Sequence, residues 1–201
     1  MVSKKTVLLL SSLLLISFVG LSQQYYKKEI DSIKTQLLLN KELDTNRVRN
    51  YYWIGKLFYL ESIPDSALVY TNKSIQLAKK LKDTSWLSSS YIQEGWIHLA
   101  NNKPSEAIIF GNKAYEMSKS NVEDSYFIFN SFNASNLLLQ TYLEKNSYSN
   151  SLKHALKAKE LYETYSGAIS LEVHVGVLNT MGYIYTETEN YIEALKIINK
   201  T

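Results

Sequence analysis

Small and aromatic residues recur along this chain at the spacing of an α-helix. Gly55 is followed three positions later by Phe58, and Ala67 is followed seven positions later, two turns along the same helical face, by Ser74. Pro64 lies between these pairs and suits the first turn of a second helix, where its missing N–H costs no hydrogen bond. The pattern predicts a helical hairpin whose two helices approach closely through small side chains.

The same pattern occurs four times. The second helix of each hairpin is predicted to open with PDSAL, PSEAI, YSNSL or YIEAL, which start at residues 64, 104, 148 and 191, at intervals of 40, 44 and 43 residues. The first small position is occupied in turn by Gly55, Gly95, Leu139 and Gly182, and the aromatic position by Phe58, His98, Tyr142 and Tyr185. The sequence therefore predicts an all-α array of four hairpins over residues 46–83, 84–122, 123–166 and 167–201, preceded by a leading helix within 24–45.

This pattern resembles the tetratricopeptide repeat (TPR), whose signature is a small residue, an aromatic residue three positions later, and a tyrosine or proline that opens a second helix carrying an alanine. The segment MGYIYTETENYIEAL, residues 181–195, is the closest match. The departures are Leu139 at the small position, His98 at the aromatic position and Glu94 where a leucine usually packs. The resemblance implies a right-handed superhelical α-solenoid that binds proteins or peptides and performs no enzymatic reaction.

The repeats are longer than the 34 residues typical of the family. They resemble the longer repeats of exported sensory regions in bacterial signalling proteins, and residues 28–55 resemble the leading helix of such sensors. The last predicted helix, from Tyr191, stops at Thr201, where the other copies continue. Two hypotheses remain open. The first is a periplasmic protein made only of repeats. The second is the sensory region of a truncated histidine kinase or DNA-binding regulator, whose output domain lies beyond residue 201.

The first 22 residues predict export. Lys4 and Lys5 precede the apolar run VLLLSSLLLISFV, and the small residues Gly20 and Ser22 follow it. This order of basic, apolar and small segments is typical of a secretory signal peptide cleaved after Ser22. The alternative is a retained membrane anchor, but the run is shorter than the roughly 20 residues that span a bilayer. We expect the mature protein in the periplasm of a Gram-negative bacterium, with no membrane span after cleavage.

Charge and cysteine content narrow the range of partners. Cleavage removes Lys4 and Lys5 and no acidic residue, which leaves 20 basic and 19 acidic residues in the mature chain. Such a nearly neutral chain has no long-range attraction for nucleic acid. Cysteine is absent, so disulfides and thiol chemistry are excluded.

Catalytic and metal-binding motifs are absent from the sequence. The three histidines, His98, His154 and His174, have no partner at metal-ligand spacing, and no phosphate-binding loop or nucleophile motif is present. His98 occupies the aromatic packing position, whereas His154 and His174 are expected on helix surfaces. We therefore predict no enzyme, no cofactor and no metal site.

A surface for binding remains. The first helices of stacked hairpins form the concave wall of a solenoid, which is its usual binding surface. Aromatic rings on that wall supply contact area and amides can pair with peptide backbone, so an extended peptide or protein segment is the predicted ligand. The predicted groove residues are Tyr52, Trp53, Lys56, Tyr59, Gln93, Trp96, Asn136, Gln140, Asn179 and Tyr183. Trp53 and Trp96 could equally pack between repeats. The C-terminal end of the array, without a capping helix, is expected to favour self-association.

Overall fold

The structure, a computed structural model, describes residues 24–119 and 124–198. Within these ranges the chain is helical and contains no strand. Residues 24–39 form a leading helical segment, which lies within the range 24–45. The elements that follow are α2 (Thr45–Leu60), α3 (Pro64–Leu81), α4 (Thr84–Ala100), α5 (Pro104–Ser118), α6 (Ser125–Glu144), α7 (Tyr148–Thr164), the short 3₁₀ helix η1 (Ser166–Ala168), α8 (Leu171–Glu187) and α9 (Tyr191–Ile198).

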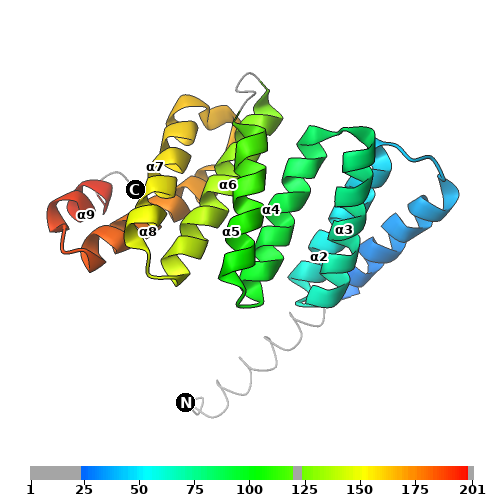
Figure 1. Ribbon diagram of the computed structural model, residues 1–201, viewed down its shortest axis with the longest axis horizontal. Helices are drawn as coiled ribbons and strands as arrows, with labels where there is room; N and C mark the ends of the chain where they lie inside the picture. Colours follow the sequence, from blue (N-terminus) through cyan, green and yellow to red (C-terminus); the bar gives the residue numbers. More distant parts are fainter. Residues whose placement is uncertain (1–23, 120–123, 199–201) are drawn as a thin grey trace, which may run out of the picture.

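The helices form a right-handed TPR-like solenoid, as the sequence predicts. Consecutive helices pair as antiparallel hairpins, and the hairpins follow one another along the long axis from the leading segment to α9 (Figure 1). The predicted starts of all four second helices are confirmed, because α3, α5, α7 and α9 begin at residues 64, 104, 148 and 191. The division of the chain into a signal peptide and repeat units stays a prediction, and residues 1–22 lie outside the described part.

One turn geometry closes the first helix of every hairpin. The residue seven positions after the small position has a left-handed backbone, with φ between 54° and 59°. The next backbone N–H then donates to a carbonyl five residues earlier, for example from Ile63 to Phe58 and from Asn190 to Tyr185. This is the bonding that ends many helices, and it sets the direction of each second helix. The four left-handed residues are Ser62, Asn102, Asn146 and Glu189.

Close packing at the small positions is confirmed in part. A Cβ at Gly55 would lie 2.7 Å from both Thr71 Oγ1 of its own hairpin and Gln93 Nε2 of the next. A Cβ at Gly95 would meet Leu137 of the following hairpin more closely than any atom of α5, so this glycine serves the contact between repeats. A Cβ at Gly182 would have its nearest neighbour at 3.8 Å, an ordinary contact. The small positions therefore carry unequal packing constraints.

The histidines differ from the sequence prediction. His98 is stacked on Phe110 in a semi-buried position, as expected. The surface assignment of His174 is wrong, because its ring is buried and stacked 3.7 Å from the ring of Tyr162. His154 is only half-exposed and stacks on Tyr142. Helical spacing alone failed here because the imidazole ring packs as a flat aromatic surface at positions where its neighbours are tyrosines.

No helix in the described ranges is long and apolar enough to cross a membrane. Over the same residues, no group of three or more acidic, histidine or cysteine side chains could hold a metal ion.

Candidate functional site

A cavity of about 560 Å³ opens on the surface formed by the first helices α2, α4 and α6. These three helices lie side by side, since α4 contacts both α2 and α6. All three tryptophans of the chain line this one cavity. Its lining residues are Tyr52, Trp53, Lys56 and Tyr59 from α2, Trp86, Ser89, Ile92, Gln93 and Trp96 from α4, and Tyr126, Phe129, Asn130 and Asn133 from α6.

Aspartate caps fix the start of each contributing helix. The side chains of Asp44, Asp83 and Asp124 accept hydrogen bonds from backbone N–H groups in the first turns of α2, α4 and α6. Such caps satisfy N–H groups that have no partner inside the helix. The donor to Asp83 is the N–H of Trp86, at 3.1 Å, so this cap also positions one of the cavity tryptophans.

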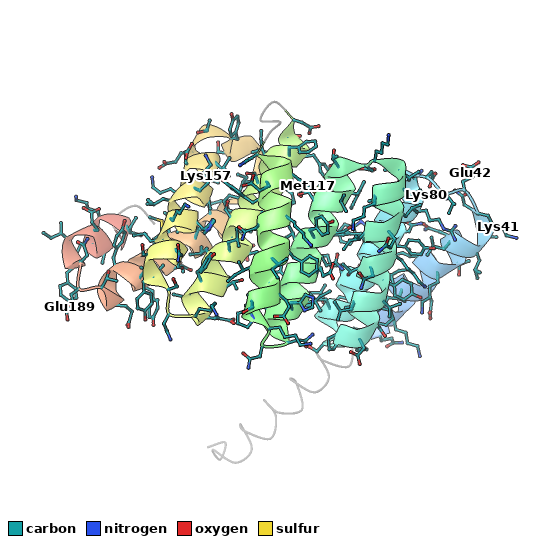
Figure 2. The ribbon with its side chains drawn as sticks, viewed as in Figure 1. Lys41, Glu42, Lys80, Met117, Lys157 and Glu189 are labelled. Carbon is teal, nitrogen blue, oxygen red and sulfur yellow. The ribbon has the colours of Figure 1, made fainter. Side chains whose placement is uncertain are left out.

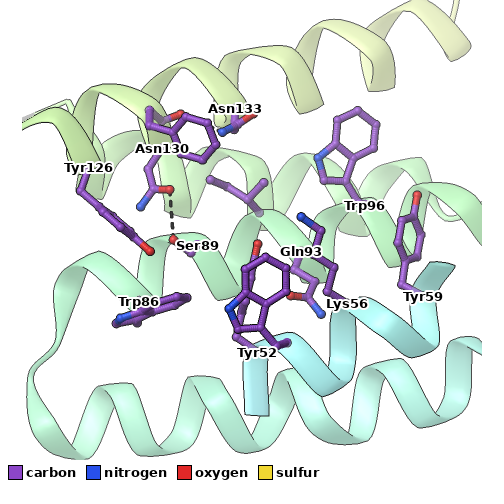
Figure 3. Close-up of a pocket in the computed structure, with 13 residues that line it drawn as sticks. Tyr52, Lys56, Tyr59, Trp86, Ser89, Gln93, Trp96, Tyr126, Asn130 and Asn133 are labelled. Atoms are coloured by element: carbon purple, nitrogen blue, oxygen red, sulfur yellow. Dashed lines mark hydrogen bonds between the residues drawn. The ribbon is translucent and has the colours of Figure 1, made fainter. Parts of the chain in front are cut away.

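Linked aromatic rings form one end of the cavity. Tyr126 and Trp86 lie at this end, and Tyr59 and Trp96 lie at the other (Figure 3). The Trp86 ring is 5.3 Å from that of Tyr52 and 5.7 Å from that of Tyr126, measured between ring centroids. Burial raises the pKa of the Tyr52 hydroxyl to about 12, and nearby Tyr126 adds to the rise. This end therefore presents an aromatic surface whose rings are held by packing on one another.

Three rings of the cavity remain open to solvent. Trp53, Tyr126 and Phe129 are 40%, 39% and 46% exposed. Large exposed aromatic rings gathered around a hollow mark surfaces that bind other molecules, because their burial would release ordered water at low cost in side-chain entropy. These three rings form an exposed aromatic rim around the cavity.

Polar side chains occupy the middle of the cavity wall. Ser89 Oγ donates to Asn130 Oδ1 at 3.0 Å, and Asn130 Nδ2 donates to the Ser85 carbonyl, which ties α6 to α4. Gln93 Nε2 donates to Thr71 Oγ1 at 3.0 Å. Gln93 is only 5% exposed, and its Oε1 has no hydrogen-bond partner within the described residues. A buried amide oxygen without a donor costs free energy, so Gln93 Oε1 is an unsatisfied acceptor in the wall of the cavity.

Lys56 is the only charged residue among those that line the cavity. Its Nζ lies 4.9 Å from the centre of the Trp53 ring, a cation–π contact. In the described part of the chain no carboxylate forms an ion pair with it. Gln93 and Lys56 lie between the two aromatic ends (Figure 3).

Six of the ten predicted groove residues line this cavity, and four do not. Asn136 and Gln140 lie further along α6, where Gln140 Nε2 donates to Thr180 Oγ1 of α8. Asn179 and Tyr183 are exposed on α8. The pKa of the Tyr148 hydroxyl is raised first by desolvation and further by nearby Tyr183. Trp96 both lines the cavity and packs against the core, whereas Trp53 lies on the rim.

Sequence reasoning missed the N-terminal turns of α4 and α6. Trp86 lies seven residues before Gln93, on the same face of α4, and Tyr126, Phe129 and Asn133 lie on α6 before Asn136. The sequence contained a signal for these residues, because the same helical face continues one or two turns toward the start of each helix. Extending that face would have added the rings that form the apolar end of the cavity.

No protein-family model matches the sequence, and no curated protein does. Solved structures do resemble the fold. BtubC from P. vanneervenii has a TM-score of 0.76 at 12% identity, covering 90% of this chain and 74% of that one. The apo form of RapI has a TM-score of 0.72 at 15% identity, covering 89% of this chain and 48% of RapI, so the chain spans about half of that protein. A kinesin light chain from Podospora anserina with nearly identical TPR-like repeats has a TM-score of 0.63 at 9% identity, covering 92% of each chain.

At these identities the comparisons establish the fold, and the fold is that of a TPR-like helical repeat protein. Its first helices carry the aromatic cavity described above.

Proposed function

We propose that this chain is a non-enzymatic module that binds an extended peptide or protein segment in the cavity formed by α2, α4 and α6. The observation that carries the proposal is the gathering of every tryptophan of the chain, with exposed Tyr126 and Phe129, around one hollow that Gln93, with its unpaired buried amide oxygen, also lines. Aromatic anchors with adjacent amides suit a peptide, which offers both side chains and backbone donors.

The tryptophans make the test direct. Peptides selected from a random dodecapeptide library should change the intrinsic tryptophan emission of the protein on titration, because every indole ring lines the site. Phe129→Ala should weaken this binding by about tenfold, the loss expected for an aromatic anchor worth roughly 1.4 kcal/mol. Its unfolding midpoint should stay almost unchanged, because exposed substitutions usually alter stability by less than about 0.5 kcal/mol.

Leu156→Ala on α7 is the matched control, since Leu156 is 47% exposed against 46% for Phe129 and does not line the cavity. Equal affinity of both variants for the selected peptides would show that the cavity is not the binding site.

Export belongs to the same proposal, and its support is the order of Lys4, Lys5, the apolar run and Ser22 in the sequence. Full-length protein expressed in a Gram-negative host should appear in the periplasmic fraction with an intact mass that lacks residues 1–22. Soluble protein that retains Met1 in the cytoplasm would contradict export. We also propose that the chain associates with a second copy through α9, on which the side chains of Tyr191, Ile192 and Leu195 are exposed.

A further inference from the structure

We propose that the cavity selects an extended peptide in which a large apolar side chain and an acidic side chain are separated by one residue. This inference rests on the proposed function and specifies its ligand. It is carried by three features of the site: the aromatic end, the position of Lys56 and the unpaired oxygen of Gln93.

The aromatic end accounts for the apolar side chain. Trp86 already contacts both Tyr52 and Tyr126, and exposed Phe129 lines the same cavity from α6. A phenyl or large aliphatic group placed here would be surrounded by rings held by their own packing, so little side-chain entropy would be lost on binding.

Lys56 accounts for the acidic side chain. A cavity rich in aromatic rings could instead take a cationic ligand, but the ammonium of Lys56 already occupies the face of Trp53 and would repel a second cation. Because no carboxylate among the described residues pairs with Lys56, an acidic ligand would provide the missing counter-charge.

Helix geometry gives the separation. Lys56 and Tyr52 lie one turn apart on α2, about 6 Å along the helix axis. An extended peptide rises about 3.3 Å per residue, so about two residues cover this distance. In an extended chain residues i and i+2 also point to the same side, which allows both side chains to face the cavity.

Gln93 accounts for a peptide rather than a small aromatic acid. Its buried Oε1 lacks a hydrogen-bond donor, and it lies on α4 between the aromatic ends. Once the Gln93 amide turns toward a ligand, a peptide backbone N–H can donate to this oxygen, whereas the carboxylate of an aromatic acid can only accept.

The probes are blocked hexapeptides that differ only in a central triplet: Phe-Ala-Asp, Phe-Ala-Asn, Phe-Ala-Lys or Ala-Ala-Asp, each prepared also in the reversed order. Tryptophan emission of the full chain follows the titrations. In one of the two orders, the Phe-Ala-Asp peptide should bind about fivefold more tightly than Phe-Ala-Asn, the gain expected from one partly exposed charge pair. Phe-Ala-Lys and Ala-Ala-Asp should bind more weakly than Phe-Ala-Asn.

Lys56→Glu should reverse the charge preference, so that Phe-Ala-Lys binds best of the four peptides. Lys41→Glu makes the same charge change in the loop between the leading segment and α2, where Lys41 is exposed and does not line the cavity (Figure 2), and it should leave the charge preference unchanged. Circular dichroism of both variants verifies that they fold.

The outcomes separate this inference from the proposed function. If library-selected peptides bind in the cavity without any preference for an acidic residue, or if Lys56→Glu leaves the preference intact, the inference is wrong and the peptide-binding function stands. If 3-phenylpropionate binds as tightly as the Phe-Ala-Asp peptide, the ligand is a small aromatic acid. If neither selected nor designed peptides alter tryptophan emission, the proposed function itself fails.

Discussion

At the scale of single residues, Glu94 is the least expected member of the core. The equivalent positions in the other hairpins hold Ile54, Leu138 and Met181, which are fully buried. Glu94 is only 7% exposed, and burial raises its pKa to about 7 although Lys113 and Lys79 act in the opposite direction. His98 Nε2 lies 3.8 Å from its carboxylate, and burial lowers the pKa of that imidazole. A carboxyl group thus replaces an apolar side chain among groups that only partly stabilise its charge.

Glu94→Gln should make the protein less sensitive to alkaline pH. Because the folded-state pKa of Glu94 is raised from 4.5 to about 7, the folded state binds more protons than the unfolded state between these values. The contribution of Glu94 is therefore fully retained below pH 4.5 and is lost as pH rises through 7. Urea denaturation should find Glu94→Gln more stable than the natural protein by up to about 3 kcal/mol at pH 8 and nearly equal at pH 4.5.

The comparison with the natural protein at each pH is necessary, because the histidines have the opposite effect. Burial lowers the pKa of His154 to about 4 and also lowers that of His174, so both destabilise the fold as pH falls below 6.5. The contributions of His154 and His174 are common to both proteins and cancel in the difference, whereas that of His98, 3.8 Å from the Glu94 carboxylate, is part of the difference. If the free energy of unfolding changes in parallel for the two proteins from pH 4.5 to 8, ionisation of Glu94 does not reduce stability.

At the scale of helices, the glycines at equivalent repeat positions predict opposite effects of the same substitution. Gly182→Ala should raise the free energy of unfolding by up to about 1 kcal/mol, because alanine favours helix and its Cβ would find its nearest neighbour at 3.8 Å. Gly55→Ala should lower it by roughly 1 to 3 kcal/mol, because its Cβ would lie 2.7 Å from Thr71 Oγ1 and Gln93 Nε2.

Thermal and urea unfolding of the two variants measure this contrast, and each variant is the control for the other since helix propensity changes equally in both. Stabilisation by both substitutions would show that Thr71 and Gln93 move aside freely. A loss of stability in both variants would mean that Gly182 lies in a tighter contact than the structure describes.

At the scale of helices, the repeat pattern in the sequence predicted part of the cavity. The repeat register predicted the starts of the second helices, and its candidate residues on α2 and α4 line one cavity, because side chains at fixed helical spacing share a face whatever the tertiary structure. It did not give the displacement between repeats. The cavity is lined by residues 52–59 of α2 but by residues 126–133 of α6. In the repeat register, residues 126–133 correspond to positions of the first hairpin that all precede Tyr52.

This displacement comes from the way stacked helices cross. Neighbouring first helices in a solenoid are not parallel, so a hollow between three of them runs diagonally from the later turns of one helix to the earlier turns of the third. Asn136 and Gln140 fall beyond the cavity for this reason, and Tyr126 and Phe129 fall inside it. The crossing depends on long-range packing such as Leu137 against Gly95, which the repeat pattern does not encode.

At the scale of the whole molecule, the two ends of the array differ. The leading segment places Ile30 and Ile33 against α2, which covers the apolar surface of the first hairpin. At the other end α9 buries Ala194 and Ile197 but leaves Tyr191, Ile192 and Leu195 at 59%, 71% and 60% exposure. The three exposed side chains occupy one short helix at the far end from Lys41 (Figures 1 and 2). In repeat arrays, an apolar face of this kind is typical of a surface that another element or molecule covers.

Self-association through α9 is the expected consequence. Sedimentation equilibrium should give an average mass that rises with protein concentration, because two copies can bury the same apolar face against each other in a symmetric dimer. Ile192→Lys combined with Leu195→Glu should abolish the rise without altering net charge. Leu38→Lys combined with Leu39→Glu, at exposed leucines near the opposite end, makes the matched change and should leave it intact. A rise that survives the α9 variant but disappears in the Leu38 and Leu39 variant would place the contact at the leading segment, because a face that drives association cannot accept a charge pair without losing the apolar area it buries.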